Sequence, residues 1–185
     1  MRRMTGWLVL AMAVTFTATG CLGRAIKEGV GVARGAKGIY APIRAVAPDK
    51  ESRPLGEYTR FELGEFTDDF GGKTPGELLA LLPAAFEEQL AAKNLLGLSG
   101  GKTLLVRGKI LHYEDATMIG FALGPLEETI ARVELVDKAT GNVLGVANCV
   151  GRTDESVNAG VPKKAEGLAK AIVSWIASRY PKKQE

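Results

Sequence analysis

Few side chains in this 185-residue sequence could carry out acid–base or nucleophilic chemistry. His112 is the only histidine, so it alone would have to serve as the base that a serine or cysteine nucleophile needs. Its alternation with Leu104 and Ile110 predicts a partly buried structural histidine on the inner face of a strand. We therefore expect no enzyme.

Paired carboxylates are the remaining candidates for acid–base work. They occur at Asp68 with Asp69, Glu87 with Glu88, and Glu127 with Glu128. Neighbouring acids on a strand point to opposite faces, and the Glu87 pair lies on the surface of a predicted helix. Solvated charge is the simpler interpretation, and an enzyme that uses Glu or Asp is the alternative.

The sequence Gly-Gly-Lys-Thr occurs twice, at Gly71–Thr74 and Gly100–Thr103, and matches the end of a phosphate-binding loop. The complete motif needs another glycine five residues before its Gly-Lys pair. Those positions hold Thr67 and Leu96, so we expect no nucleotide and no cofactor. One histidine, and the one cysteine left if Cys21 carries lipid, also make no usual zinc-ligand set, so we expect no metal.

The first twenty residues are typical of an export signal. Arg2 and Arg3 give a positive start, and an uncharged apolar run of twelve residues follows, Trp7–Ala18. A membrane-spanning helix needs roughly twenty residues to cross a core of about 30 Å, so this run is too short to be one. Small residues then lead to a cysteine, Cys21.

The order Ala18-Thr19-Gly20-Cys21 resembles the lipobox of bacterial lipoproteins. The resemblance implies cleavage between Gly20 and Cys21, a diacylglycerol on the Cys21 thiol, and acyl chains such as palmitate in the membrane. Leu22 in place of an aspartate favours the outer membrane, with the domain on its periplasmic side. The alternative is a plain secretory signal, which would leave Cys21 able to pair with Cys149.

Cleavage before Cys21 would also remove Arg2 and Arg3, leaving 22 basic and 21 acidic residues. A net charge of +1 gives no reason to expect nucleic acid as a partner. Hydrophobic residues make up 46% of the chain, a value typical of a domain with a buried core. Once Cys21 carries lipid, Cys149 is the one free thiol and no internal disulfide forms.

Residues 21–57 are rich in glycine and proline and predict a flexible tether after the lipidated N-terminus. The part of this segment up to Ala47 has a net charge of +4. The charges are those of Arg24, Lys27, Arg34, Lys37 and Arg44 against Glu28. Such a segment either lies on anionic headgroups or is a solvated linker. The single folded domain is expected to cover residues 58–185.

Hydrophobic periodicity predicts four strands and two helices in this domain. The strands are expected at Tyr58–Phe66, Lys102–Asp115, Glu128–Asp137 and Val143–Gly151, and the helices at Thr74–Lys93 and Lys163–Tyr180. Thr74 with Glu77 predicts a capping box at the start of the first helix. Pro83 predicts a kink or a restart within it. Small residues on one face of the fourth strand predict close approach by a helix: Gly145, Ala147, Cys149 and Gly151.

The order of these elements, β-α-β-β-β-α, predicts an α+β fold. We expect a two-layer sandwich in which two helices cover one face of a mixed sheet of about four strands. The outer face should carry charged residues, because Arg60, Arg107, Lys109 and Arg132 alternate with the apolar positions. The first strand–helix–strand unit should be a right-handed parallel crossover.

An uncharged stretch, Met118–Gly124, lies where the sequence predicts a connection between two strands. An exposed apolar loop usually marks a contact with protein or membrane. The candidate contact residues are Met118, Ile119, Phe121 and Leu123. The alternative is a loop that folds over the sheet edge and buries its apolar side chains in the core.

Several segments together resemble the family of small bacterial envelope lipoproteins known as domain of unknown function 4410. The resemblance covers roughly 103–176 and rests on LVRGKILHYED, GFALG, RVELVDKATGNVLG and the closing helix. That family has no established reaction. The resemblance therefore implies an envelope location and an α+β fold, and it assigns no catalytic residue.

These observations favour a non-catalytic, lipid-anchored envelope protein whose domain binds another envelope component. The contact surface would combine the Met118–Gly124 loop with the charged outer face of the sheet. The alternative function is a carrier that holds a lipid or another apolar small ligand between the sheet and the helices.

Mass spectrometry of the mature N-terminus tests the anchor. We expect the chain to begin at Cys21 with a mass increase that corresponds to diacylglycerol and an amide-linked acyl chain. A chain that begins elsewhere, or an unmodified Cys21, would show that the lipoprotein interpretation is wrong.

Overall fold

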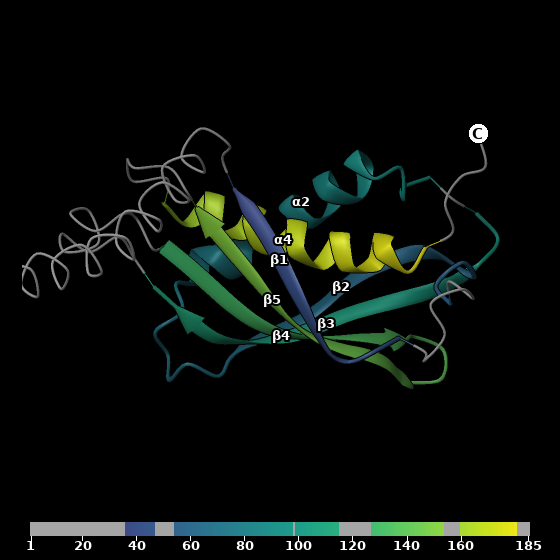
Figure 1. Cartoon of the computed structure of the whole chain (residues 1–185), viewed down its shortest axis with the longest axis horizontal. Helices are drawn as coiled ribbons and strands as arrows, with labels where there is room; N and C mark the ends of the chain where they lie inside the picture. Colours follow the sequence, from purple (N-terminus) through teal and green to yellow (C-terminus); the bar gives the residue numbers. More distant parts are fainter. Residues whose placement is uncertain (1–35, 47–53, 98, 115–126, 154–159, 181–185) are drawn as a thin grey trace, which may run out of the picture.

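The computed structural model describes residues 36–46, 54–97, 99–114, 127–153 and 160–180 (Figure 1). The Cys21 region, the Met118–Gly124 stretch and their predicted roles lie outside these residues. The described elements follow in the order β1 (Lys37–Arg44), β2 (Tyr58–Asp68), α2 (Gly76–Ala92), β3 (Lys102–Tyr113), β4 (Glu127–Asp137), β5 (Val143–Thr153) and α4 (Gly160–Ser178).

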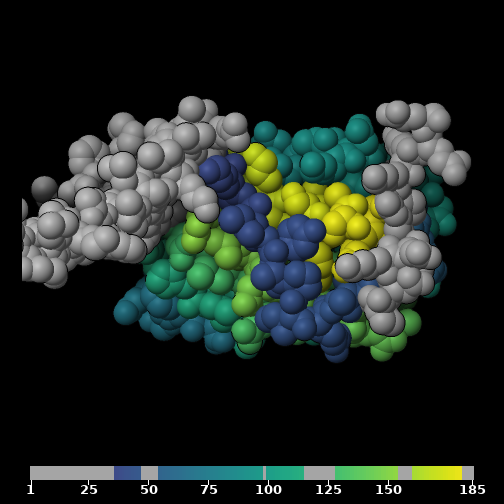
Figure 2. All heavy atoms as spheres, viewed as in Figure 1, coloured from purple at the N-terminus to yellow at the C-terminus, as the bar shows by residue number. Residues whose placement is uncertain are grey.

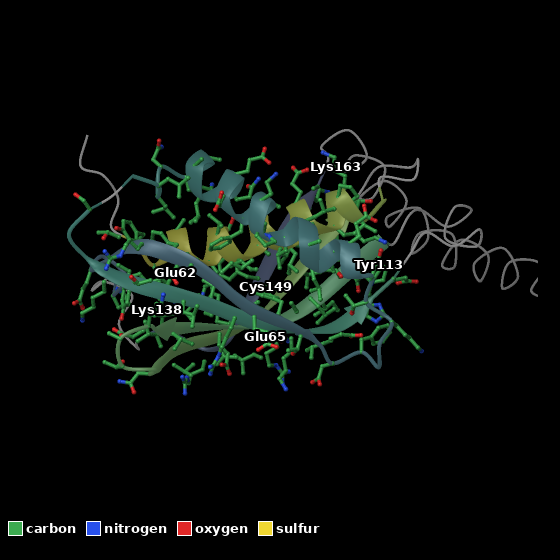
Figure 3. The ribbon with its side chains drawn as sticks, turned by 180° about the vertical axis from the view of Figure 1, so that it is seen from behind. Glu62, Glu65, Tyr113, Lys138, Cys149 and Lys163 are labelled. Atoms are coloured by element: carbon green, nitrogen blue, oxygen red, sulfur yellow. The ribbon has the colours of Figure 1, made fainter. Side chains whose placement is uncertain are left out.

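The strands form one mixed sheet in the order β1-β5-β4-β3-β2. The pairs β1–β5, β5–β4 and β4–β3 are antiparallel, and β3–β2 is parallel. The parallel pair confirms the parallel crossover predicted for the first strand–helix–strand unit, and its right-handedness stays a prediction. Both helices lie on the same side of the sheet in Figure 1 and in the reverse view of Figure 3.

Strand β1 corrects the prediction of a flexible tether over 21–57. It pairs antiparallel with β5, with Lys37 opposite Arg152 and Tyr40 opposite Cys149. The glycine and proline in KGIYAPIR interrupt the hydrophobic alternation, so periodicity alone does not predict this strand. Proline is tolerated because β1 is an edge strand, where one side of the backbone needs no partner in the ladder.

The inner faces of the strands and the apolar stripes of the helices enclose one core. The predicted inward positions on β3 and β4 are all buried: Leu104, Val106, Ile110, Ala131, Val133 and Leu135. Both predicted helix stripes are buried as well, namely Leu78, Leu82, Phe86 and Leu90 in α2 and Ala165, Leu168, Ile172, Trp175 and Ile176 in α4. Alternation and helical spacing therefore located the core correctly.

The start of α2 differs from the predicted capping box. The helix begins at Gly76 after Pro75, which makes no side-chain capping hydrogen bond. The Thr74 hydroxyl instead donates to Asp68 Oδ1 at 2.8 Å, and the amide of Phe70 donates to the same oxygen at 2.7 Å. The first Gly-Gly-Lys-Thr copy is thus part of a turn organised by Asp68. The helix then continues through Pro83 without restarting.

Helix α4 meets β1 and β5 backbone to backbone. A Cβ atom on Gly38 would lie 2.2 Å from the amide nitrogen of Ala171, and one on Gly151 would lie 2.4 Å from that of Leu168. Gly167 of α4 lies at the same crossing, against the carbonyl of Lys37. Larger side chains would keep the helix away from the sheet. The predicted close approach of a helix to β5 is therefore confirmed.

Within the described residues the α+β fold with two helices is confirmed, and the mixed sheet has five strands where about four were predicted. The additional strand is β1. Helix α4 packs on β1, β5 and β4, whereas α2 packs mainly on α4 and has little contact with the sheet. The finer description as a two-layer sandwich stays a prediction.

The substitution Gly38→Ala tests the backbone contact. We expect it to lower the free energy of unfolding by about 1–3 kcal/mol, because the new methyl group overlaps the α4 backbone. Urea unfolding followed by tryptophan fluorescence measures the change. Gly76→Ala is the matched control, since no other atom lies within 4 Å of its added Cβ. Equal unfolding midpoints for the two variants would contradict the proposed constraint.

Candidate functional site

A solvent-open hollow of about 1040 Å³ lies at the end of the sheet where β2 and β3 begin. Its wall also includes the start of the turn between β4 and β5. The lining residues are Gly56, Glu57, Thr59, Arg60, Glu62, Ser99, Gly100, Gly101, Lys102, Thr103, Lys138 and Ala139. In Figure 3, Glu62 and Lys138 lie side by side at this end, far from Tyr113.

A buried hydrogen bond between β2 and β4 lies behind the wall of the hollow, at residues adjacent in sequence to the lining residues Glu57, Thr59 and Lys138. The Tyr58 hydroxyl donates to Asp137 Oδ2 at 2.8 Å. The other oxygen of Asp137 accepts from the amides of Ala139 and Thr140, each at 3.0 Å. Gly141 completes the turn with a φ of 73°, which glycine adopts without strain. The turn predicted from KATGN is therefore present and is held by Asp137.

The same contacts keep Tyr58 and Asp137 from exchanging a proton near neutral pH. The hydrogen bond from Tyr58, followed by that from the Thr140 amide, lowers the pKa of Asp137. Burial, with the neighbouring Asp137, raises the pKa of Tyr58 above its usual range. Asp137 is therefore a carboxylate and Tyr58 a phenol, which suits a structural pair and not an acid–base pair.

Five charged side chains line the hollow, and ion pairs and hydrogen bonds connect them along its wall. Lys102 pairs with Glu57 at 2.8 Å, and that hydrogen bond raises the pKa of Lys102. Lys138 pairs with Glu62 at 2.5 Å. Arg60 donates from Nε to the Thr103 hydroxyl at 2.9 Å. Exposed pairs of this kind add little stability, so these groups remain available to a charged or polar partner.

The second Gly-Gly-Lys-Thr copy forms part of this wall. Gly101 packs so closely that a Cβ there would lie 2.4 Å from the Glu57 carbonyl oxygen, and its amide donates to the Thr59 hydroxyl at 2.8 Å. The copy leads into β3, as predicted, and not into a helix. The two copies therefore lie in separate turns, and each has a structural role.

The face of the sheet opposite the helices carries the predicted charged residues. Arg107 pairs with Glu134 at 2.9 Å, and Arg132 reaches Asn148 at 3.4 Å. Lys109 lies 3.8 Å from Asp69. Cross-strand register places these residues on β3, β4 and β5 as neighbours. Arg60 and Glu62 on β2 extend this surface to the hollow.

His112 lies on the other face from the one predicted. A β-bulge follows Ile110, so His112 is opposite Ile130 and not opposite an inward residue. Its ring packs edge-on against Phe70 with the centroids 5.3 Å apart, and Nε2 lies 3.7 Å from Glu114. Its partly exposed position agrees with a structural role, although the predicted face was wrong.

The carboxylate pairs do not converge on a common site. Asp68 holds the turn before α2: burial alone would raise its pKa, but hydrogen bonds from Phe70 and Thr74 outweigh burial and lower it. Glu87 and Glu88 are exposed on α2. Glu128 pairs with Arg152 at 2.9 Å. These positions fit the interpretation of solvated or structural charge.

Cys149 is fully buried against α4, as its place on the small-residue face predicted. Burial raises the pKa of its thiol to about 12, so the reactive thiolate is not formed at neutral pH. Among the residues that the structure describes, no three His, Cys, Asp or Glu side chains form a group able to hold a metal ion.

A second polar cluster, which the sequence did not reveal, lies at the opposite end of the sheet. Lys164 is fully buried in α4, and its ammonium donates to the Tyr113 hydroxyl at 3.1 Å while lying 4.2 Å from the ring centroid. The nearby Thr153 hydroxyl is buried. The sequence contains one hint of this burial, the position of Lys164 directly before Ala165, which belongs to the buried stripe of α4. That hint is weak, because a lysine in a helix is normally expected at the surface.

No family model matches the chain. No curated protein matches it either. Membership of the domain of unknown function 4410 family therefore stays a prediction. No helix among the described residues is both long and apolar enough to cross a membrane.

Solved structures with remote likeness include two of PelC dodecamers from Paraburkholderia phytofirmans. One has 14% identity and a TM-score of 0.46, covering 76% of this chain and 96% of that one. The other has 11% identity and a TM-score of 0.44, with 80% and 99% covered. A "putative lipoprotein" from Caulobacter crescentus CB15 has 12% identity and a TM-score of 0.41, with 64% and 88% covered.

The substitution Asp137→Asn tests the electrostatics of the buried Tyr58–Asp137 pair next to the hollow. The lowered pKa means that the Asp137 carboxylate stabilises the fold fully above about pH 4 and loses this contribution as the pH falls through the folded-state pKa. We expect the variant to be less stable at pH 7 and to lose less stability than wild type between pH 7 and pH 3. Urea midpoints over this range measure the difference.

Glu87→Gln, an exposed change on α2, is the control and should follow the wild-type pH profile. A profile for Asp137→Asn parallel to that of the wild type would show that the carboxylate contributes nothing to acid sensitivity.

Proposed function

We propose that the chain is a non-catalytic lipoprotein of the cell envelope whose α+β domain binds another envelope component. Cys21 carries the lipid, and the domain faces the periplasm from the outer membrane. The lipobox-like residues before Cys21 support the anchor, and the hollow at the β2–β3 end supports the binding role.

The single observation that carries this proposal is the continuity of the hollow with the charged outer face. Arg60 and Glu62 belong to both, and Lys138 joins the turn to β2 through Glu62. Charges of both signs, about half exposed, suit a protein surface with complementary charges. Arginine is also enriched in protein interfaces.

An apolar ligand finds less support. Its site would lie between the sheet and the helices, where Gly38, Gly151 and Gly167 bring α4 into backbone contact with β1 and β5. The hollow lies outside that interface, and its wall is charged, whereas sites for apolar small molecules are mostly lined by hydrophobic side chains. The predicted apolar contacts Met118, Ile119, Phe121 and Leu123 lie outside the described residues and stay a separate prediction, since the stretch connects the end of β3 to the start of β4, away from the hollow.

Photo-crosslinking in intact cells tests the proposal. With benzoylphenylalanine in place of Lys138, we expect a crosslink to one discrete envelope protein, because this side chain lines the hollow. The matched control places the same group at Glu87, on the exposed side of α2, and should not yield that product.

Charge reversal then checks the mechanism of recognition. Arg60→Glu should lower the crosslink yield from position 138 several-fold, whereas Lys93→Glu, at the exposed end of α2, should not. Two results would contradict a partner at the hollow. One is the same crosslinked product from positions 138 and 87. The other is a folded Arg60→Glu variant whose crosslink yield from position 138 is unchanged.

A further inference from the structure

Edge strand β1 combines exposed apolar side chains with basic ones, of which Arg44 is exposed and Lys37 is partly buried. Ile39 and Ile43 are 51% and 55% exposed, high values for isoleucine in a folded domain. Lys37 and Arg44 lie at the two ends of the same strand, which carries no acidic residue. We name these four residues the β1 edge. Figure 2 shows β1 at the molecular surface, lying across β5 and α4.

The register extends the apolar part of this surface onto the neighbouring strands. Ile39 is opposite Val150, and Val150 is opposite Ile130, so three branched side chains form a row across β1, β5 and β4. This row lies on the face away from α4, because the adjacent Gly38 and Gly151 face the helix. Beside it, Arg152 pairs with Glu128 in the row that begins at Lys37.

The β1 edge is the part of the described domain nearest in sequence to the proposed anchor. Only 14 residues, 22–35, separate Cys21 from Ala36. Whatever their conformation, they span at most about 54 Å. The Lys170 ammonium donates to the Ala36 carbonyl at 3.2 Å, which fixes the point where the chain enters the domain. A short connection of this kind gives a tethered surface a high effective concentration at the membrane.

The connecting residues add charge of the same sign. Arg24, Lys27 and Arg34 against Glu28 give 22–35 a net charge of +2, and Lys37 and Arg44 follow within the strand. Basic residues close to a membrane are attracted to anionic headgroups, and exposed branched side chains beside them can enter the headgroup region. An open strand edge cannot enter the hydrocarbon core, because its unpaired backbone groups need water.

We propose that the β1 edge lies against the anionic headgroups of the membrane that carries the lipid anchor. The inference rests on the proposed lipidation of Cys21. It assigns β1 two roles, as a strand of the sheet and as the element that orients the domain. The wall of the hollow includes β2 and β3, and β2 is the edge strand at the opposite end of the strand order from β1. The hollow therefore remains accessible to a protein partner.

Site-specific labelling of the lipidated full chain tests this proposal. Ile39→Cys is labelled with the environment-sensitive dye NBD, and the buried Cys149 leaves the new thiol as the reactive one. The protein is reconstituted into vesicles of phosphatidylethanolamine with phosphatidylglycerol. We expect a blue shift of NBD emission relative to detergent, and quenching by lipids that carry a quencher at the headgroup. Leu96→Cys is the matched control, because Leu96 is 47% exposed outside the β1 edge and should remain in water.

Removing the anchor isolates the contribution of the charges. In a Cys21→Ser background, Lys37→Gln with Arg44→Gln should weaken partitioning onto the same vesicles by at least about tenfold. High salt should weaken it similarly, since the Debye length falls to about 3 Å at 1 M. The paired change Lys73→Gln with Lys93→Gln, at exposed positions outside the β1 edge, should have little effect.

The outcomes separate this inference from the proposed function. If the protein inserts through its lipid but the labels at positions 39 and 96 report the same aqueous environment, the inference is wrong and the anchor stands. If the chain does not insert into vesicles at all, both are wrong. If the label at position 39 is already shielded in detergent and becomes exposed on dilution, a second copy covers β1 and the membrane is not its partner.

Discussion

The close contact between the backbone of α4 and those of β1 and β5 is the constraint on which the rest of this structure depends. Gly38, Gly151 and Gly167 remove the side chains that would otherwise separate the helix from the sheet. Trp175, Leu168 and other large side chains then fill the core on either side of the crossing. Backbone-to-backbone packing of this kind tolerates almost no added volume, so it fixes both the position of α4 and the place of β1 in the sheet.

This constraint also divides the molecule into regions with different capabilities. Where α4 meets β1 and β5, no room remains for a ligand. At the β2–β3 end, the turn held by Asp137 leaves an open hollow whose charges are exposed. At the other end, Lys164 is buried beside Tyr113. The hollow and the β1 edge therefore lie toward opposite edges of one sheet, beside β2 and at β1 respectively.

Local patterns predicted a large part of the fold, and the exceptions have identifiable causes. Alternation placed Val106 and Val133 inward, and spacing by fours placed Phe86 in the core, because strand and helix geometry repeat with fixed periods. A single extra residue in a strand shifts this alternation, and the bulge after Ile110 therefore places His112 on the face opposite to the predicted one. The turn at Asp68 is a different exception, since the Thr74 hydroxyl donates to the Asp68 carboxylate in place of the expected helix cap. The candidate hollow was not predicted at all, because its walls come from segments far apart in the chain.

The sequence by itself predicts an export signal with Cys21, and it determined the α+β class, the two described helices and the inward faces of the central strands, since each depends on residues close together in the chain. The tertiary structure alone decided the strand formed by 37–44, the burial of Lys164 and the gathering of Arg60, Lys102 and Lys138 around one hollow. A glycine- and proline-containing segment has little preference of its own for a strand. It becomes one here because β5 offers a free edge to pair with and α4 accepts a glycine at the contact, which are properties of the folded molecule and not of the segment.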